Sequence, residues 1–186
     1  MDDSSLTDEQ MYARMKNGWR GGLEDGTVCG GGSTMEATAA ARVWLADWSR
    51  HACIDSVCDA GAGDLHWQGA IKWAVKYTPF DLIPRRPEVM RLDICKETLP
   101  KADAILCRHV LNHLDSIRVA MAVERFRESG ARYLIATQFD YTVPGDTREF
   151  CRLDLRPLLG AYIEAIEDGG PPDSNCKLAV WELNGC

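Results

Sequence analysis

The clearest pattern of hydrophobic and polar positions lies between residues 37 and 48. Apolar side chains recur there every three or four residues, so they fall on one face of a helix. Ser33 precedes this pattern as a natural N-cap, and Glu36 three residues later completes a capping-box pattern. The sequence therefore predicts a helix that begins at Ser33 and buries one apolar face. The apolar positions are Ala37, Ala40, Ala41, Trp44, Leu45 and Trp48.

Short apolar runs bounded by turn residues are typical of buried strands. The chain contains a series of such runs, separated by segments with helical or turn patterns. The predicted strands cover residues 54–59, 74–80, 88–94, 102–107, 133–139, 162–166 and 178–183.

Helical segments are expected between several of these strands. Apolar spacing over residues 119–126 predicts a helix that ends near Gly130, residues 64–67 indicate a helix start, and residues 6–16 indicate a short helix. Strands that alternate with helices favour a parallel sheet with helices on both faces. The last two strands are joined by a turn-rich loop, so they are expected to pair antiparallel. The predicted class is α/β: a doubly wound, mostly parallel seven-stranded sheet with a C-terminal antiparallel hairpin.

Length and composition agree with one globular domain. The 186 residues are 46% hydrophobic and 26% charged, which is ordinary usage for a chain that buries a core. No apolar run is long enough to cross a membrane, and the acidic, polar start does not resemble a secretion signal. The net charge of −7 argues against an extensive nucleic-acid-binding surface. We expect a cytoplasmic location.

The eight cysteines form no CxxC pair. Several lie in or beside apolar strand-like runs, which favours buried free thiols in a reducing compartment. A zinc site would need more closely paired ligands. We therefore expect no metal site, although a set made of Cys107, His109 and His113 is the alternative.

A glycine-rich turn follows the first predicted strand in the sequence VCDAGAGD, residues 57–64. Gly61 and Gly63 allow a sharp turn and the close approach of a ligand. The turn lacks the third glycine of the dinucleotide pattern GxGxxG, since His66 stands at that position, and the chain has no GxxxxGK[ST] loop. These absences argue against a nicotinamide-dependent oxidoreductase and a triphosphate site.

Three acids lie at the ends of three consecutive predicted strands. Asp59 comes just before the glycine turn, Asp81 ends the second strand, and Asp93 lies near the end of the third. A carboxylate in the second position typically accepts hydrogen bonds from ribose hydroxyls, and one in the third position can accept from an adenine amino group. We expect the three to converge on one crevice at the carboxyl edge of the sheet. The alternative is that they only cap turns.

These segments resemble motifs of the class I S-adenosylmethionine-dependent methyltransferases. VCDAGAGD is similar to the first motif, and FDL (80–82) and LDI (92–94) are similar to the segments that carry the ribose and adenine acids. ADAILCRHVLNHL (102–114) resembles the fourth strand and the active-site segment after it. A GxGST-x3-T-x3-R pattern also resembles a compact subgroup that is often encoded by phages and bacteria. Its positions are Gly30, Gly32, Ser33, Thr34, Thr38 and Arg42.

The resemblance covers residues 30–183 and implies an enzyme that uses S-adenosyl-L-methionine to methylate an unidentified acceptor. It implies one methyltransferase-like domain over residues 1–186, in which residues 1–32 are an N-terminal extension that caps the cofactor site. A phage-encoded protein would act in the host cytoplasm. The predicted cofactor-binding residues are Asp59, Ala60, Gly61, Gly63, Asp81, Leu82, Asp93, Ile94, Cys107, Arg108, Ser33 and Thr34.

The chain departs from the family pattern in two ways. Prolines at 84 and 87 rule out the helix that the family usually places after its second strand. The [DNS]PP[YFW] motif of amino-methylating DNA enzymes and the Pro-Cys motif of cytosine-C5 enzymes are both absent. Acceptor selection is therefore expected from the N-terminal segment and the loop of residues 140–152.

His109 and His113 are the predicted catalytic residues. They follow the fourth strand and are four residues apart, a spacing that one helical turn would bring to one face. An unperturbed histidine titrates near 6.5, which suits a base that removes a proton from the acceptor. Arg108 is expected to pair either with a substrate anion or with Asp103.

Two other functions remain open at this point. An enzyme that cleaves the cofactor without an acceptor would release methylthioadenosine, whereas methyl transfer releases S-adenosylhomocysteine. A non-catalytic binding protein would keep the fold and lose affinity for the cofactor. The exposed edge of the C-terminal hairpin also makes a homodimer a prediction.

Overall fold

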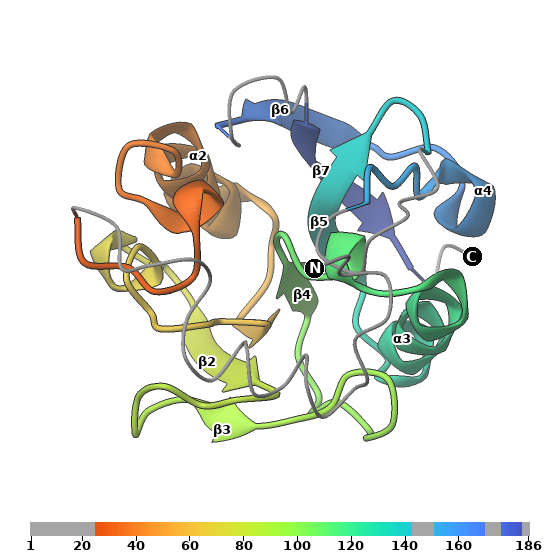
Figure 1. The fold of residues 1–186 in the computed structure, drawn as a ribbon, viewed down its shortest axis with the longest axis horizontal. Coiled ribbons are helices and arrows are strands. Elements are labelled where there is room, and N and C mark those ends of the chain that lie inside the picture. Colours follow the sequence, from red (N-terminus) through yellow and green to blue (C-terminus); the bar gives the residue numbers. More distant parts are fainter. Residues whose placement is uncertain (1–24, 143–150, 170–175, 184–186) are drawn as a thin grey trace, which may run out of the picture.

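The structure is a computed structural model that describes residues 25–142, 151–169 and 176–183 (Figure 1). The short helix predicted over residues 6–16, and most of the loop of residues 140–152, lie outside the described residues. No described helix has the length and apolar character needed to span a membrane.

A seven-stranded sheet with the order β3-β2-β1-β4-β5-β7-β6 forms the centre of the fold (Figure 1). Strands β1 to β5 pair parallel, and β7 pairs antiparallel with both β5 and β6. The predicted fold class, including the C-terminal antiparallel hairpin, is confirmed. The strands are β1 (Ser56–Ala60), β2 (Lys76–Asp81), β3 (Met90–Arg91), β4 (Ala104–Cys107), β5 (Tyr133–Phe139), β6 (Glu164–Asp168) and β7 (Cys176–Glu182).

Two helices of 13 residues each cover opposite faces of this sheet (Figure 1). Because side chains alternate along a strand, Ala104 and Leu106 of β4 pack with the core under α2, whereas Ile105 and Cys107 pack with the core under α3. The predicted helices on both faces are therefore present. The described helices are α2 (Ala39–His51), α3 (Ser116–Glu128) and the short α4 (Arg156–Leu159).

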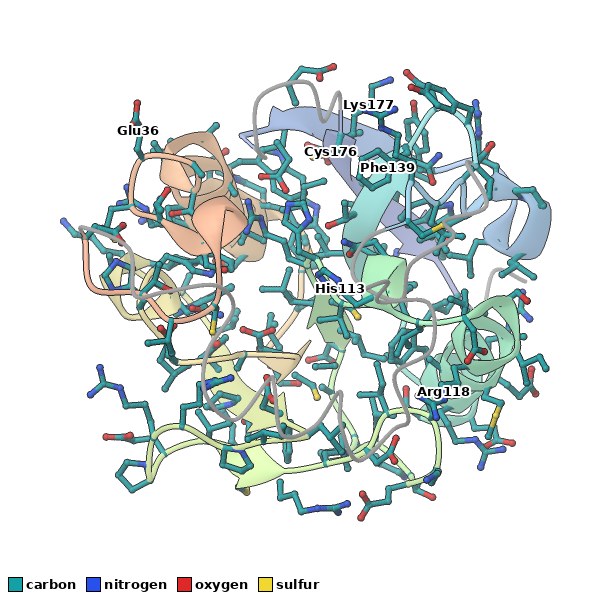
Figure 2. The ribbon with its side chains drawn as sticks, in the orientation of Figure 1. Glu36, His113, Arg118, Phe139, Cys176 and Lys177 are labelled. Atoms are coloured by element: carbon teal, nitrogen blue, oxygen red, sulfur yellow. The ribbon has the colours of Figure 1, made fainter. Side chains whose placement is uncertain are left out.

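The predicted start of the first helix is wrong. Helix α2 begins at Ala39, Ser33 ends a 3-10 turn over Gly31–Ser33, and Glu36 points into solvent (Figure 2). The capping box does not form, because the Ser33 amide that would pair with Glu36 donates to the Gly30 carbonyl oxygen at 2.9 Å. Two neighbouring amides also have other acceptors. The Ala37 amide donates to Thr34 Oγ1 at 3.1 Å, and the Met35 amide donates to the Asp25 carboxylate at 2.7 Å.

The helix start predicted at residues 64–67 is also wrong. That segment is a series of turns followed by a 3-10 turn over Gln68–Ala70, and residues 61–75 contain no α-helix. Leu65 has a φ of 57°, which an α-helix does not allow. The Asp64 carboxylate instead accepts hydrogen bonds from the Val28 amide and the Thr27 hydroxyl. It therefore ties the glycine-turn region to the chain that precedes α2.

Strand β3 is much shorter than predicted, since only Met90 and Arg91 pair with β2. Asp93 consequently lies two residues beyond the strand rather than inside it. The segment between β2 and β3 contains no α-helix, as its two prolines predict.

Candidate ligand site at the carboxyl edge of the sheet

A cavity of about 320 Å³ opens at the carboxyl ends of β1, β2 and β4. It lies where the chain crosses from the β1–β2–β3 side of the sheet to the β4 side, which is the usual ligand position in an open α/β sheet. The three predicted acids converge here, as do both predicted histidines. Of the predicted cofactor residues, Thr34 and Cys107 do not line it. Those that do are Ser33, Asp59, Ala60, Gly61, Gly63, Asp81, Leu82, Asp93, Ile94 and Arg108.

The glycine turn is packed between two other parts of the chain. Gly61 and Gly63 both have positive φ values, 114° and 61°. A Cβ on Gly61 would overlap Val110, and one on Gly63 would lie 2.7 Å from Cys29 Sγ. A larger side chain at residue 61 would therefore collide with the protein itself before it reached the ligand space. The turn needs glycine for its own conformation and packing.

Asp59 lies beneath this turn and is 1% exposed. Tyr77 Oη donates to its carboxylate at 2.5 Å, and Gln68 Nε2 donates at 3.3 Å. Burial raises the pKa of Asp59 to about 7, even though both hydrogen bonds act to lower it. The Gln68 Oε1 atom is buried and has no hydrogen-bond partner. The cavity lining therefore includes one buried acceptor, Gln68 Oε1, that has no donor.

Asp81 connects the glycine turn to the segment after β2. Its Oδ2 accepts from the Gly63 amide at 2.9 Å, and its Oδ1 accepts from the Ile83 amide at 2.8 Å. Burial raises the pKa of Asp81 and outweighs these two bonds. Each carboxylate oxygen keeps a further lone pair for a ligand.

Asp93 is held in the next loop by local hydrogen bonds. Its Oδ1 accepts from the Cys95 amide at 3.0 Å, and its own amide donates to Glu97 at 2.7 Å. Asp93 and Asp81 therefore lie on the β2–β3 side of the cavity, together with the apolar side chains of Leu82 and Ile94.

The predicted pairing of Arg108 with Asp103 is wrong. Asp103 accepts hydrogen bonds from the Ser56 hydroxyl and the Asp55 amide. These residues lie at the amino ends of β1 and β4, whereas the cavity is at the carboxyl ends. Arg108 instead forms a buried ion pair with Asp168 at the end of β6, with 2.9 Å between Nε and Oδ2. The sequence analysis did not identify Asp168.

His109 has an unusual backbone for a residue with a side chain. Its φ is 53°, and its amide donates to Thr137 Oγ1 at 2.8 Å. Strained backbone of this kind is concentrated at functional sites. Burial, and then the Arg108 charge, lower the pKa of His109, so its imidazole is neutral near pH 7.

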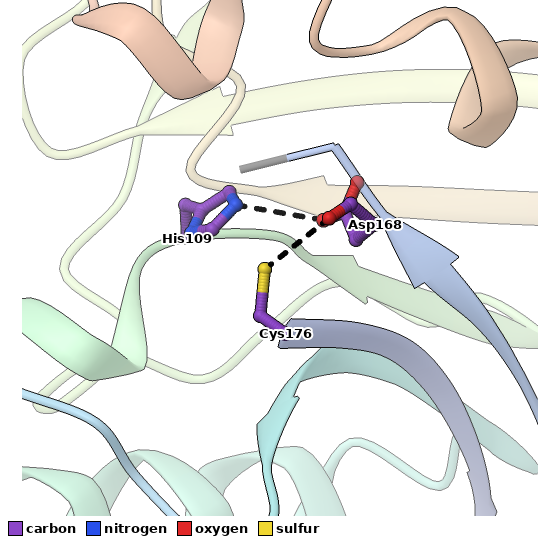
Figure 3. A group of neighbouring side chains, drawn as sticks. All are labelled: His109, Asp168 and Cys176. Carbon is purple, nitrogen blue, oxygen red and sulfur yellow. Dashed lines mark hydrogen bonds and ion pairs between the residues drawn. The ribbon is translucent and has the colours of Figure 1, made fainter. Parts of the chain in front are cut away.

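The His109 ring lies beside Asp168 and Cys176 (Figure 3). Its Nε2 faces the Asp168 carboxylate, with 3.5 Å between Nε2 and Oδ2. One donor atom from each of these three residues lies within 4.8 Å of the others, a spacing that could hold a metal ion. Both Asp168 oxygens already accept from Arg108, however, so this arrangement favours the guanidinium over a second cation.

His113 and His109 do not share the helical turn that their spacing suggested. The left-handed residue 109 is followed by a 3-10 turn over Leu111–His113, which Figure 2 shows beside the end of β4. Both histidines nevertheless line the cavity.

Asn112 and Gln68 are cavity residues that the sequence analysis missed. Asn112 is buried, its Nδ2 is 3.4 Å from His113 Nε2, and its Oδ1 has no partner. Its backbone oxygen accepts from the Cys151 amide at 2.7 Å. In the sequence, only one feature indicates that the Asn112 and Gln68 side chains reach the cavity: each residue follows a strand that ends there.

Comparison with known proteins shows which solved structures share this fold. No family model and no curated protein matches the sequence. Among solved structures, the chain is similar to the N-methyltransferase NodS of Bradyrhizobium japonicum WM9 bound to S-adenosyl-L-homocysteine. The TM-score is 0.59 and the identity is 15%, over 78% of this chain and 87% of NodS.

Two further methyltransferases are similar to the chain in fold. The 1,6-didemethyltoxoflavin-N1-methyltransferase of Burkholderia thailandensis has a TM-score of 0.59 and 14% identity, over 78% of this chain and 77% of that one. Human N-acetylserotonin methyltransferase has a TM-score of 0.53 and 12% identity, over 80% of this chain and 53% of that one. The chain therefore has the Rossmann-like fold of S-adenosylmethionine-dependent methyltransferases.

Proposed function

We propose that the protein binds S-adenosyl-L-methionine in this cavity and transfers its methyl group to an acceptor. The observation that carries the proposal is the convergence of a glycine turn with three acids at the crossover point of the sheet. Each of these features has a chemical counterpart in the cofactor, which joins a positively charged amino-acid end to an adenosine.

The buried polar atoms of the cavity fit this cofactor. Gln68 Oε1 lacks a donor and lies beside the Asp59 carboxylate, an environment that suits an ammonium group. Asp81 keeps lone pairs for ribose hydroxyls, and Asp93 can accept from an adenine amino group. Leu82 and Ile94 offer apolar surface for the adenine ring. Thr34 and Cys107 do not line the cavity. They would therefore affect cofactor binding only indirectly, by shaping the segments that do line it.

Bound here, S-adenosylmethionine would supply a methyl group that its sulfonium sulfur has already activated. The protein's contribution is then mainly to position the acceptor. We assign proton acceptance to His109, because its buried imidazole is neutral near pH 7 and the residue lines the cavity. His113 is the second candidate, and Asn112 Oδ1 can accept a hydrogen bond from the acceptor.

We infer that the acceptor is a small molecule. The Burkholderia enzyme was solved with its small-molecule acceptor, 1,6-didemethyltoxoflavin, on the same fold. The net charge of −7 gives no support to an extended nucleic-acid surface. The free thiols among the described cysteines fit a cytoplasmic location.

Calorimetric titration with S-adenosylmethionine, and separately with S-adenosylhomocysteine, tests the proposal. We expect micromolar affinity for both ligands. If neither binds, the cofactor assignment fails and a non-catalytic binding protein takes its place. Analysis of the reaction products with candidate small molecules then separates the activities: S-adenosylhomocysteine indicates transfer, whereas methylthioadenosine indicates cleavage.

A further inference from the structure

A buried ion pair joins three distant segments beside the cavity. Arg108 follows β4 and Asp168 ends β6, and their side chains are 2% and 0% exposed. Asp168 accepts from Arg108 through both oxygens: Oδ2 from Nε at 2.9 Å, and Oδ1 from Nη2 at 2.9 Å. The third segment is the glycine-rich 3-10 turn over Gly31–Ser33, whose Gly32 carbonyl oxygen accepts from Arg108 Nη1 at 2.7 Å.

The glycine-rich turn forms part of the cavity wall, and its attachments come from the β4–β6 side of the sheet. Gly31, Gly32 and Ser33 line the cavity. The His109 ring lies close to Gly32, since a Cβ there would be 3.5 Å from the ring. A Cβ on Gly169, the residue after β6, would overlap the Ala37 carbonyl oxygen just beyond the turn. The end of β6 is therefore packed tightly against this part of the chain.

The protein itself already uses three of the five N–H groups of Arg108. Its Nε, Nη1 and Nη2 atoms all donate to protein oxygens, and its Cζ lies 5.2 Å from the centre of the Trp67 ring. A buried ion pair of this kind is usually no more stabilising than apolar residues of similar size. A role in stability alone therefore explains the pair poorly, whereas a role in fixing the position of Gly32 explains why Arg108 donates to both Asp168 and the Gly32 carbonyl oxygen.

The order of the strands indicates which end of the ligand meets this wall. The ribose and adenine acids follow β2 and β3, on one side of β1, whereas Arg108 and Asp168 follow β4 and β6, on the other side. A ligand that spans the crossover with its adenosine over β2 and β3 has its other end toward β4 and the Gly31–Ser33 turn.

We propose that Asp168 is a positioning residue: it orients Arg108 so that the guanidinium holds the Gly31–Ser33 wall against the amino-acid end of the cofactor. This inference rests on the proposed function, because it assumes that S-adenosylmethionine occupies the cavity. Asp168 does not itself line the cavity, so its effect on the ligand passes through Arg108 and Gly32.

The test compares two ligands that differ only at one end. S-adenosylhomocysteine carries the amino-acid group, whereas 5′-methylthioadenosine keeps the nucleoside and the thioether and lacks that group. Calorimetric titration of Asp168→Asn is expected to show at least about tenfold weaker binding of S-adenosylhomocysteine, about 1.4 kcal/mol, with 5′-methylthioadenosine nearly unchanged. If Arg108 bound the ligand directly, releasing it from Asp168 would leave S-adenosylhomocysteine binding unchanged or tighter, and the proposal would be wrong.

A second variant covers the case in which Asp168→Asn does not fold. Replacing both partners, as Arg108→Met with Asp168→Leu, removes the buried charges together, and this change is often neutral or stabilising. We expect a folded protein with the same selective loss of S-adenosylhomocysteine affinity. Equal losses for both ligands, or wild-type affinity for both, would overturn the proposal.

Glu182→Gln is the matched control, because it breaks the exposed ion pair between Arg132 and Glu182 away from the cavity. It should bind both ligands like the wild type. Failure of the wild type itself to bind S-adenosylhomocysteine would reject the proposed function rather than this inference.

Discussion

The two sides of the cavity are built in different ways. On the β2–β3 side, Asp81 and Asp93 are held by amides only a few residues away or in the neighbouring turn, such as those of Ile83 and Cys95. On the β4–β6 side, Arg108 is held by Asp168, which is 60 positions further along the chain. Local hydrogen bonds form with little loss of chain entropy, whereas a pair this distant depends on the complete sheet. We therefore expect the first side to respond to substitution by losing ligand affinity, and the second by losing stability as well.

The largest expected effect is on the stability of the β4–β6 side. Asp168→Ala leaves the Arg108 guanidinium buried and without its carboxylate, which typically costs about 3–5 kcal/mol. Urea unfolding should show this loss in the free energy of unfolding. A loss below about 1 kcal/mol would mean that Arg108 finds another partner or reaches water, and that the two sides are less different than the structure indicates.

The pH dependence of stability probes Asp59, which lies at the boundary between the two sides. Its folded pKa, about 7, is above its ordinary value of 3.8 because burial disfavours the charged form. The folded state thus binds the proton more tightly, and Asp59 contributes stability at low pH that is lost as the pH rises from about 4 to about 7. Asp59→Asn removes this contribution.

Unfolding of the wild type and Asp59→Asn at several pH values between 4 and 7 measures the effect. The stability of the variant relative to the wild type should increase across this interval. Parallel stability profiles would show that folding leaves the pKa of Asp59 near its ordinary value.

On the β2–β3 side, Asp81→Ala should weaken S-adenosylhomocysteine binding by at least about tenfold, or about 1.4 kcal/mol. The change removes the expected acceptor of the ribose hydroxyls and also releases the Gly63 amide. Here 5′-methylthioadenosine should lose affinity as well, in contrast to the selective effect expected for Asp168→Asn. Unchanged affinity in a folded variant would reject the ribose assignment.

The smallest expected effect is at the surface. The Arg132 and Glu182 side chains are 57% and 40% exposed, so water screens their attraction. Glu182→Gln should change the free energy of unfolding by less than about 0.5 kcal/mol. A loss approaching that of Asp168→Ala would remove the distinction between buried and exposed pairs on which the comparison depends.

Much of the β2–β3 side could be predicted from the sequence because its pattern is local. Apolar runs predicted β1 and β2 within a few residues, and the acids and glycines that follow them lie at the cavity as expected. The errors on this side also have local causes. The helix start at residues 64–67 fails because Asp64 is used to bind Thr27 and Val28, partners that no local pattern identifies.

The sequence by itself determined the order of the strands along the chain, the C-terminal hairpin, and the acids and glycines of the cavity. These depend on the period of the apolar positions and on turn chemistry, which act over a few residues. Only the tertiary structure decided that Arg108 pairs with Asp168 rather than Asp103, and that Asn112 and Gln68 bring unpartnered oxygens to the cavity. The physical reason is that β6 lies at the far edge of the sheet and is joined to it only through β7, so Asp168 reaches Arg108 only once the sheet is complete.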